Sequence, residues 1–332
     1  MKLKIDHRKC PVCGQKMIKK GKRKSGKQKW YCKHCRKYHS FKRKDLTEKA
    51  DLKMYCDYVL KGHNHEFYDM PKSKFFRKIK KFRSLTIRSP KISPIPENYL
   101  HLDGIYKNRD YCHLIVKSKD GIIAFKECKT ENSEHWGSVL VNIPPPNYVI
   151  IDGQKGMNKA IKLYWPDTKI QICLFHVKST VKHKLTSRPK LEAGKELKFI
   201  ADAIINVKTK SQAEKWWIVF NDFLQQYKDF INEKVKSEGK RPWYKHRSLR
   251  SCIRYLKRLY EKGQLFLYTE VTDFILPRTN NKMEGGTNSV IKRKSRLHPG
   301  MNRDNLRQLI KIVLMSQTKT YNSDRLGDIF DT

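Results

Sequence analysis

The sequence is poor in acidic residues, with 32 Asp and Glu against 73 Lys and Arg among 332 residues and a formal net charge of +41. An excess of one sign on this scale opposes compaction and attracts polyanions. Nucleic acid or an anionic membrane surface is therefore the expected partner, and a small neutral metabolite is not. Apolar residues make up 38% of the chain, which is enough to build hydrophobic cores.

Long apolar runs are also missing. The longest uncharged stretch, Trp136–Ile151, is interrupted by three prolines, so we expect no membrane-spanning helix and no membrane partner. No apolar segment follows Met1, which predicts that the chain is not secreted. Nine cysteines, an odd number, favour a reducing compartment where thiols bind metal or stay free. We therefore expect a cytoplasmic protein associated with the nucleoid.

The positive charge is distributed unevenly along the chain. Residues 1–44 hold 18 basic residues against one acidic residue, and residues 45–96 hold 12 against six. Residues 97–176 hold ten against nine, whereas residues 177–283 hold 24 against 11 and residues 284–332 hold nine against five. One nearly neutral block thus keeps its carboxylates in an otherwise basic chain. Divalent metal binding is the expected use for them.

Two C-x2-C pairs near the amino terminus predict a zinc site. Cys10 and Cys13 form the first pair, and Cys32 and Cys35 form the second after 18 intervening residues. This spacing is typical of a four-thiolate zinc ribbon, whose folding energy the metal supplies. We expect residues 1–44 to form such a ribbon with one structural Zn²⁺ and to bind DNA phosphates. Four free surface thiols are the alternative.

Residues 45–96 are predicted to form two or three short helices followed by a proline-rich linker. The second helix, about Ser73–Arg83, has an apolar side and a basic side. This fits a helix-turn-helix segment whose second helix enters a DNA major groove. An amphipathic helix with a solvated basic face is the alternative. The side chains expected to reach DNA from this helix are Lys74, Arg77, Lys78 and Lys81.

The block from residue 97 to residue 190 predicts an α/β domain. Its strands and helices are expected at Tyr99–Tyr106, Tyr111–Lys117, Gly121–Cys128, Asn132–Val141 (helix), Tyr148–Asp152, Lys155–Tyr164 (helix) and Lys169–Phe175. Three antiparallel strands followed by helix, strand, helix and strand is the order of an RNase H-like core, in which a mixed sheet carries helices on its faces.

Two aspartates stand out in this arrangement. Asp103 lies inside the first strand, where aspartate is disfavoured, and Asp152 ends the fourth strand. Because these strands are neighbours in the predicted fold, the two carboxylates should face one another. Such a repulsive pair persists mainly where divalent cations neutralise it. The alternatives are that Asp103 belongs to an Asp-Gly turn and that Asp152 caps the following helix.

A third acid is found far downstream, where Glu284, Asn288 and Lys292 follow one another at steps of four residues. On one helix they would line a single face. With Asn280 in Thr279–Asn281, these residues resemble the T-N-x-x-E motif of Mutator-like bacterial insertion-sequence transposases of the DDE type, with one additional residue before the glutamate.

A second element of the resemblance is Cys173-Leu-Phe-His176, which matches the C-x2-H motif that these transposases carry after the second aspartate. The resemblance implies that Cys173 and His176 are neighbours of the active site. It also implies that the long separation between the second and third acids contains an all-helical insertion, here residues 191–277, and that residues 278–332 return to the core. The aromatic residues of the insertion, which include Trp216 and Phe220, are expected to form its own hydrophobic core.

The function that the resemblance implies is DNA transposition. Asp103, Asp152 and Glu284 would hold two Mg²⁺ or Mn²⁺ ions for strand cleavage and strand transfer, with Asn288 beside them. Lys292 and the adjacent basic residue would reach DNA phosphates; the pair is Lys292 and Arg293. The expected partners are the terminal inverted repeats, the target DNA and a second copy of the chain. A non-catalytic zinc-ribbon regulator and a metal-dependent hydrolytic nuclease remain as alternatives.

Overall fold

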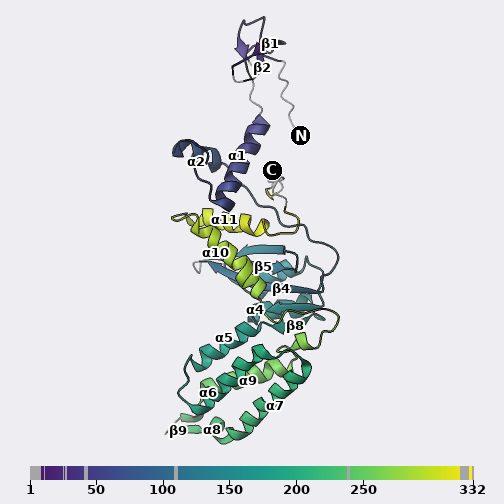
Figure 1. The fold of residues 1–332 in the computed structure, drawn as a ribbon, viewed down its shortest axis with the longest axis vertical. Coiled ribbons are helices and arrows are strands. Elements are labelled where there is room, and N and C mark those ends of the chain that lie inside the picture. Colours follow the sequence, from purple (N-terminus) through teal and green to yellow (C-terminus); the bar gives the residue numbers. More distant parts are fainter. Residues whose placement is uncertain are drawn as a thin grey trace. The chain divides into compact units, whose positions relative to one another are not determined.

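A computed structural model describes residues 9–10, 12–24, 26, 28–40, 44–107, 111–237, 240–321 and 329–330, and it leaves out the side chains at positions 44–47, 107, 236, 237, 240, 282 and 284. The chain divides into two compact units, residues 1–85 and residues 86–332, and each is described by itself (Figure 1). Among the described residues, none of the helices combines the length and the apolar character needed to cross a bilayer.

The first unit begins with a small antiparallel sheet. Its strands are β1 (Ile18–Lys22), β2 (Gln28–Tyr31) and β3 (Tyr38–His39), and β2 lies between the other two. Among its described residues, Met17 and Trp30 pack against four cysteines in its hydrophobic core. A core of this size buries too little apolar surface to fold alone, so the sheet depends on another source of stability.

Two helices complete the first unit, as the sequence predicts. Helix α1 (Lys44–Lys61) ends at Gly62, whose φ of 76° lies in the left-handed region and whose N–H donates to Tyr58 O over 3.0 Å. Helix α2 (Lys72–Lys80) buries Phe75 and Ile79. It ends three residues before the predicted limit because residues 81–84 form turns.

A five-stranded mixed sheet forms the centre of the second unit. Its strands are β4 (Tyr99–Lys107), β5 (Tyr111–Lys117), β6 (Ile122–Cys128), β7 (Tyr148–Ile151) and β8 (Lys169–Ile172), arranged in the order β6-β5-β4-β7-β8. The first three pair antiparallel in sequence order, whereas β4 pairs parallel with β7 and β7 pairs parallel with β8. The predicted α/β class is confirmed, and β4 and β7 are neighbours as expected.

Helix α3 (Ser133–Leu140) connects β6 to β7, and α4 (Lys155–Tyr164) connects β7 to β8. Helix α5 (Leu174–Leu185) follows β8. The side chain of Asn132 caps α3 by accepting a hydrogen bond from the N–H of His135 over 2.8 Å. The predicted last strand was wrong at its end, because β8 stops at Ile172 and α5 begins two residues later. The Cys-x2-His element therefore lies at the start of a helix and not in a strand.

The inserted segment contains α6 (Glu192–Ala203), η1 (Ile204–Asn206), α7 (Lys210–Gln226), α8 (Lys228–Asn232), α9 (Arg247–Glu261) and η2 (Leu267–Thr269). The prediction of an all-helical insertion was wrong in one respect, because β9 (Lys234–Ser237) and β10 (Lys240–Tyr244) form an antiparallel pair. Val235 and Trp243, a β-branched and an aromatic residue, lie opposite each other there. Trp216 and Phe220 are buried and stacked as expected, but they belong to one hydrophobic cluster with the residues of the sheet and not to a separate core.

The chain then returns to the sheet through a π-helical segment, η3 (Lys282–Asn288), followed by α10 (Ser289–Arg296) and α11 (Arg303–Met315). Helix α11 is held to β6 by charge. Glu127 on β6 accepts from Arg307 Nε over 2.7 Å and pairs with Lys311 Nζ over 2.8 Å. Burial would raise the pKa of Glu127, but its hydrogen bonds with these two cations outweigh that effect and lower it.

Replacing Glu127 with alanine is expected to destabilise the second unit, because Arg307 and Lys311 lose their common acceptor. Both cations are partly exposed, so we expect a loss of only about 1–2 kcal/mol. Urea unfolding followed by circular dichroism measures the change. Glu134→Ala is the matched control, since Glu134 is exposed in the first turn of α3. Equal stability of the two variants would show that the charge contact does not hold α11 in place.

Candidate active site

Asp103 and Asp152 lie on neighbouring strands of the sheet. The parallel pairing of β4 and β7 places His101 opposite Ile150. Asp103 lies two residues after His101, and Asp152 lies two residues after Ile150. Residues two apart along a strand share a face. Asp103 is 7% exposed, and Asp152 is half-buried just beyond β7, where its Oδ1 accepts from the N–H of Gln154 over 2.8 Å. The structure thus brings the two predicted aspartates together.

The electrostatics of Asp103 reflect this neighbour. Burial raises the pKa of Asp103 to about 6, and the charge of Asp152 adds to the increase. A hydrogen bond from Asn288 and the charge of His176 act in the opposite direction. A carboxylate that is costly to ionise beside a second carboxylate is stabilised by a cation placed between them. The pair has the chemistry of a divalent-metal site.

Two of the predicted neighbours reach the aspartates from distant parts of the chain. Asn288 Nδ2 donates to Asp103 Oδ2 over 3.3 Å from the end of η3. His176 lies in the first turn of α5, close enough for its charge to affect the Asp103 carboxyl. The structure thus places Asn288 in contact with Asp103, and His176 near enough to act on it electrostatically; their part in a reaction stays a prediction.

Cys173 contributes by holding the backbone in position. Its buried Sγ accepts from the N–H of Asn280 over 3.1 Å, and the next N–H, that of Leu174, donates to Arg278 O over 3.1 Å. The Asn280 side chain is fully buried, with Oδ1 accepting from His101 Nδ1 over 2.7 Å and Nδ2 donating to Leu102 O over 3.2 Å. Asn280 thus ties the segment before η3 to β4 beside Asp103.

Glu284, the predicted third acid, lies in η3 and its side chain is outside the described residues. The regular helix predicted from Glu284 to Lys292 was wrong in its first half, where the backbone is π-helical, and α10 begins only at Ser289. Such π-helical turns are frequent at functional sites. Gly285 faces open space, so close packing within the chain does not explain the glycine there.

A carboxylate that the sequence reading missed, Glu131, lies near both aspartates. Burial raises the pKa of Glu131 to about 7, and the charges of Asp152 and Asp103 add to the increase. A hydrogen bond that Trp136 Nε1 donates to Glu131 Oε1 over 3.0 Å acts in the opposite direction. A Cβ at position 104 would overlap Glu131 Oε2, so Gly104 makes room for this carboxylate. A glycine inside a strand often marks a close approach of this kind, so Gly104 is the sequence feature that could have pointed to Glu131.

These carboxylates form an open arrangement. Among the side chains that the structure describes, the four cysteines are the only group of three or more possible ligands whose donor atoms all lie within 4.8 Å of one another. Asp103, Asp152 and Glu131 are therefore more widely spaced than a closed cage. Mg²⁺ retains several waters and substrate oxygens in enzyme sites, so an open set of carboxylates is compatible with it.

The four predicted zinc ligands do converge. The Sγ atoms of Cys10 and Cys35 are 3.4 Å apart, and those of Cys13 and Cys32 are 3.5 Å apart. A tetrahedral ion with Zn–S bonds of about 2.3 Å requires sulfurs about 3.8 Å apart. Burial would raise the pKa of Cys10, but backbone hydrogen bonds in its knuckle outweigh it and lower the pKa to about 6. The cluster could hold zinc.

The predicted DNA-contacting residues divide into two groups. Lys74 and Arg77 on α2 and Lys292 and Arg293 on α10 are exposed. Lys78 and Lys81 instead form ion pairs with acids of α1, namely Lys78 Nζ with Asp51 Oδ1 at 2.6 Å and Lys81 Nζ with Glu48 Oε1 at 3.1 Å. These two pairs connect α2 to α1.

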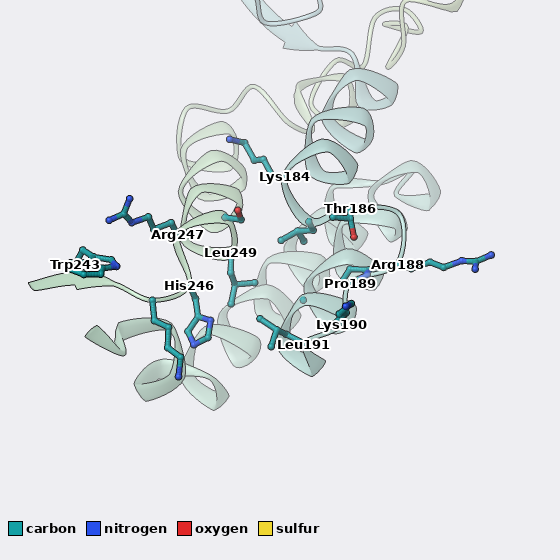
Figure 2. A pocket seen from close by; sticks show the side chains of 14 residues that line it. Lys184, Thr186, Arg188, Pro189, Lys190, Leu191, Trp243, His246, Arg247 and Leu249 are labelled. Carbon is teal, nitrogen blue, oxygen red and sulfur yellow. The ribbon is translucent and has the colours of Figure 1, made fainter. Parts of the chain in front are cut away.

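A cavity of about 580 Å³ lies between the α5–α6 connection and the start of α9 (Figure 2). None of the predicted site residues lines it. Its walls include Lys184, Arg188, Lys190 and Arg247, and no acidic residue. The cavity therefore cannot hold a metal through carboxylates, and its charge suits an anion.

The comparison with known proteins agrees with this geometry. Residues 99–180 match the family model of the MULE transposase domain. The match runs from β4 into α5 and includes Asp103, Asp152, Cys173 and His176, whereas η3 lies beyond it. No curated protein matches the chain. The predicted resemblance to Mutator-like transposases is confirmed, and the chain carries a MULE transposase domain at residues 99–180.

Proposed function

We propose that the chain is a DDE-type DNA transposase that binds the terminal inverted repeats of its insertion sequence and catalyses Mg²⁺-dependent strand cleavage and strand transfer. The observation that carries this proposal is the pair Asp103 and Asp152, which lies on neighbouring strands within the MULE domain and whose carboxylates interact electrostatically. Glu284 completes the proposed metal-binding triad.

The sheet supports an RNase H-like core. Three antiparallel strands run inward from one edge in the order β6, β5, β4, and the parallel strands β7 and β8 extend the sheet beyond β4, the first strand in sequence. This order makes the first and fourth strands neighbours, which is what a site built from Asp103 and Asp152 requires.

Each residue of the site has a proposed part in the reaction. Asp103, Asp152 and Glu284 would hold two Mg²⁺ ions, which when bound supply an activated water or 3′-hydroxyl and stabilise the leaving oxygen. Asn288 Nδ2 donates to Asp103 Oδ2 and would orient this carboxylate for a metal ligand role. The pKa of Glu131 is raised to about 7, so it can take up or release a proton near neutral pH.

DNA would be bound by basic residues of both units. The zinc ribbon, Lys74 and Arg77 are proposed to contact the terminal repeats, and Lys292 and Arg293 the strand that enters the site. Two element ends must be joined in one reaction, so at least a dimer on DNA is proposed. The proposed location is the nucleoid of the cytoplasm, where the DNA lies.

The test uses purified full-length protein with DNA that carries the terminal repeats flanking its gene. Nicking at the repeat ends that requires Mg²⁺, and joining of a precut 3′-hydroxyl end into a target plasmid, are the expected results. Cleavage without joining would indicate a hydrolytic nuclease. Salt-sensitive binding with neither reaction would indicate a non-catalytic regulator, and either outcome would overturn the proposal.

A further inference from the structure

Helix α9 in the inserted segment carries basic residues along one face. They follow one another at steps of seven, four and four residues, which places them on the same side of a helix. All are exposed, and the opposite side of α9 is apolar and buried. The basic residues are Arg247, Arg254, Arg258 and Lys262. We call them the α9 basic face.

One end of this face meets a second row of cations. A cavity of about 440 Å³ between α4 and α9 is lined by Arg258 of α9 and Lys262, the residue after its end, and by Lys155, Lys159 and Lys162 from α4. No acidic residue lines it, and the structure records no ion pair among its described residues for any of these five cations. Cations on facing walls repel one another unless an anion lies between them.

The position of this cavity connects it to the proposed active site. Gly153, which directly follows Asp152, is one of its lining residues. An anion bound between α4 and α9 would therefore lie beside the residue that follows Asp152. A nucleic-acid strand whose phosphates occupy this cavity would have its next phosphate near Asp152.

The other end of the α9 basic face meets the cavity of Figure 2. Arg247 lines that cavity, with its guanidinium 5.9 Å from the ring centre of Trp243. Figure 2 shows Trp243 and Arg247 on one side of the cavity and Arg188 on the other. Cations from the α5–α6 connection thus face a cation of α9, and no acidic residue intervenes.

We propose that the α9 basic face and the cavities at its two ends form a track for the phosphate backbone of duplex DNA that leads to Asp152. The 15 residues of α9 extend over about 22 Å, the length of about six base pairs. A helix face that is merely solvated does not need cations opposite it at both ends. The choice of DNA as the polyanion rests on the proposed function.

The first test needs no variant. Full-length protein is treated with an acetylating reagent, free and saturated with a duplex of about 30 base pairs, and the lysines are mapped by mass spectrometry. We expect DNA to reduce labelling of Lys159, Lys162 and Lys262 at least about fivefold, while Lys215 and Lys228, exposed on α7 and α8, stay reactive. Unchanged labelling of the three track lysines would overturn the proposal. So would protection by pyrophosphate and not by DNA.

The second test compares two variants with equal loss of charge. Arg254→Gln/Arg258→Gln removes two cations of the track, and Lys215→Gln/Lys228→Gln removes two exposed cations elsewhere in the insertion. The track variant is expected to bind duplex about tenfold more weakly than the control, with the slope of log K against log salt reduced by about 0.9 for each phosphate that the protein no longer neutralises. Equal affinities and slopes would overturn the proposal.

These results can be separated from those on catalysis. DNA-dependent protection of the track lysines without any strand cleavage would leave the track intact and overturn the proposed activity. Strand cleavage with track lysines that DNA does not protect would support the proposed activity and overturn the track.

Discussion

Replacing Asp103 with asparagine is expected to reduce Mg²⁺-dependent cleavage of element ends by at least about a thousandfold. The substitution removes a carboxylate from the proposed metal pair, and metal ions supply several kcal/mol of transition-state stabilisation, each 1.36 kcal/mol of which is a factor of ten in rate. Single-turnover cleavage of a labelled duplex measures the loss. Cleavage by Asp103→Asn at the wild-type rate would exclude a catalytic role for this residue.

The same variant should be more stable than the wild type in the absence of metal. Burial and Asp152 raise the folded-state pKa of Asp103 from 3.8 to about 6, so the folded state binds a proton more tightly than the unfolded state. The ionised carboxyl therefore destabilises the fold as pH rises from about 4 to 6, by up to about 3 kcal/mol. With EDTA, Asp103→Asn should melt higher than wild type at pH 8 and equally at pH 3.5. If Asp103→Asn melted below the wild type at pH 8, its loss of activity would be explained by a destabilised fold.

Glu131→Gln tests the acid that the sequence reading missed. If Glu131 only takes up and releases a proton, Glu131→Gln should bind metal as the wild type does, and its cleavage rate should no longer change with pH around 7. Glu284→Gln should instead lose metal-dependent cleavage. Isothermal titration with Mn²⁺ distinguishes these outcomes, since loss of Mn²⁺ binding by Glu131→Gln would place Glu131 among the ligands.

Removing one zinc ligand is the second large effect that we expect. Cys32→Ser should abolish zinc binding and unfold residues 9–40, because among the described residues only Met17 and Trp30 pack beside the four cysteines, and the metal contributes about 10–16 kcal/mol in such modules. The expected observations are the loss of equimolar zinc by atomic emission and complete hydrogen exchange over these residues within seconds. The main thermal transition, which arises from the second unit, should not shift.

His34→Ala is the matched control for the zinc prediction. His34 is exposed in the second knuckle, between Cys32 and Cys35, so its loss should leave zinc and structure unchanged. His39 lies closer, with Nε2 3.6 Å from Cys10 Sγ. A Cys32→Ser protein that retained equimolar zinc would show that His39 or another group can replace the thiolate.

Much of the fold could be predicted because the patterns are local. The strands around Asp103 and Asp152 follow from short apolar runs and turn residues, and their adjacency follows from the order of the elements. The β9–β10 hairpin was missed because its strands are short and rich in lysine, so no alternation of apolar residues marks them. The π-helical turn at Glu284 was missed because its hydrogen bonding is not encoded in residue spacing.

The site was predictable where a residue type is unusual for its place, and not where its role depends on a distant partner. Asp103 stood out because aspartate is rare within a strand. Glu131 did not, since an acid just before a helix is ordinary, and only its fit against Gly104 brings it near the aspartates. The ion pairs of Lys78 and Lys81 with α1 likewise depend on helix packing that spacing does not reveal.

The hydrogen bonds that join Cys173 to Asn280 and Leu174 to Arg278 have a consequence for protein engineering. They bring together two points about a hundred residues apart along the chain, so most of the inserted segment leaves and re-enters the core at one place. The segment is in this sense a side branch whose length does not set the position of η3. Shortening or replacing the outer helices α6–α8 would leave these two hydrogen bonds in place, provided that residues 264–268, which bond to β8, and Leu276, which packs with Ile150 and Cys173, are kept. The length of the inserted segment would then become a design variable separate from the position of the acids.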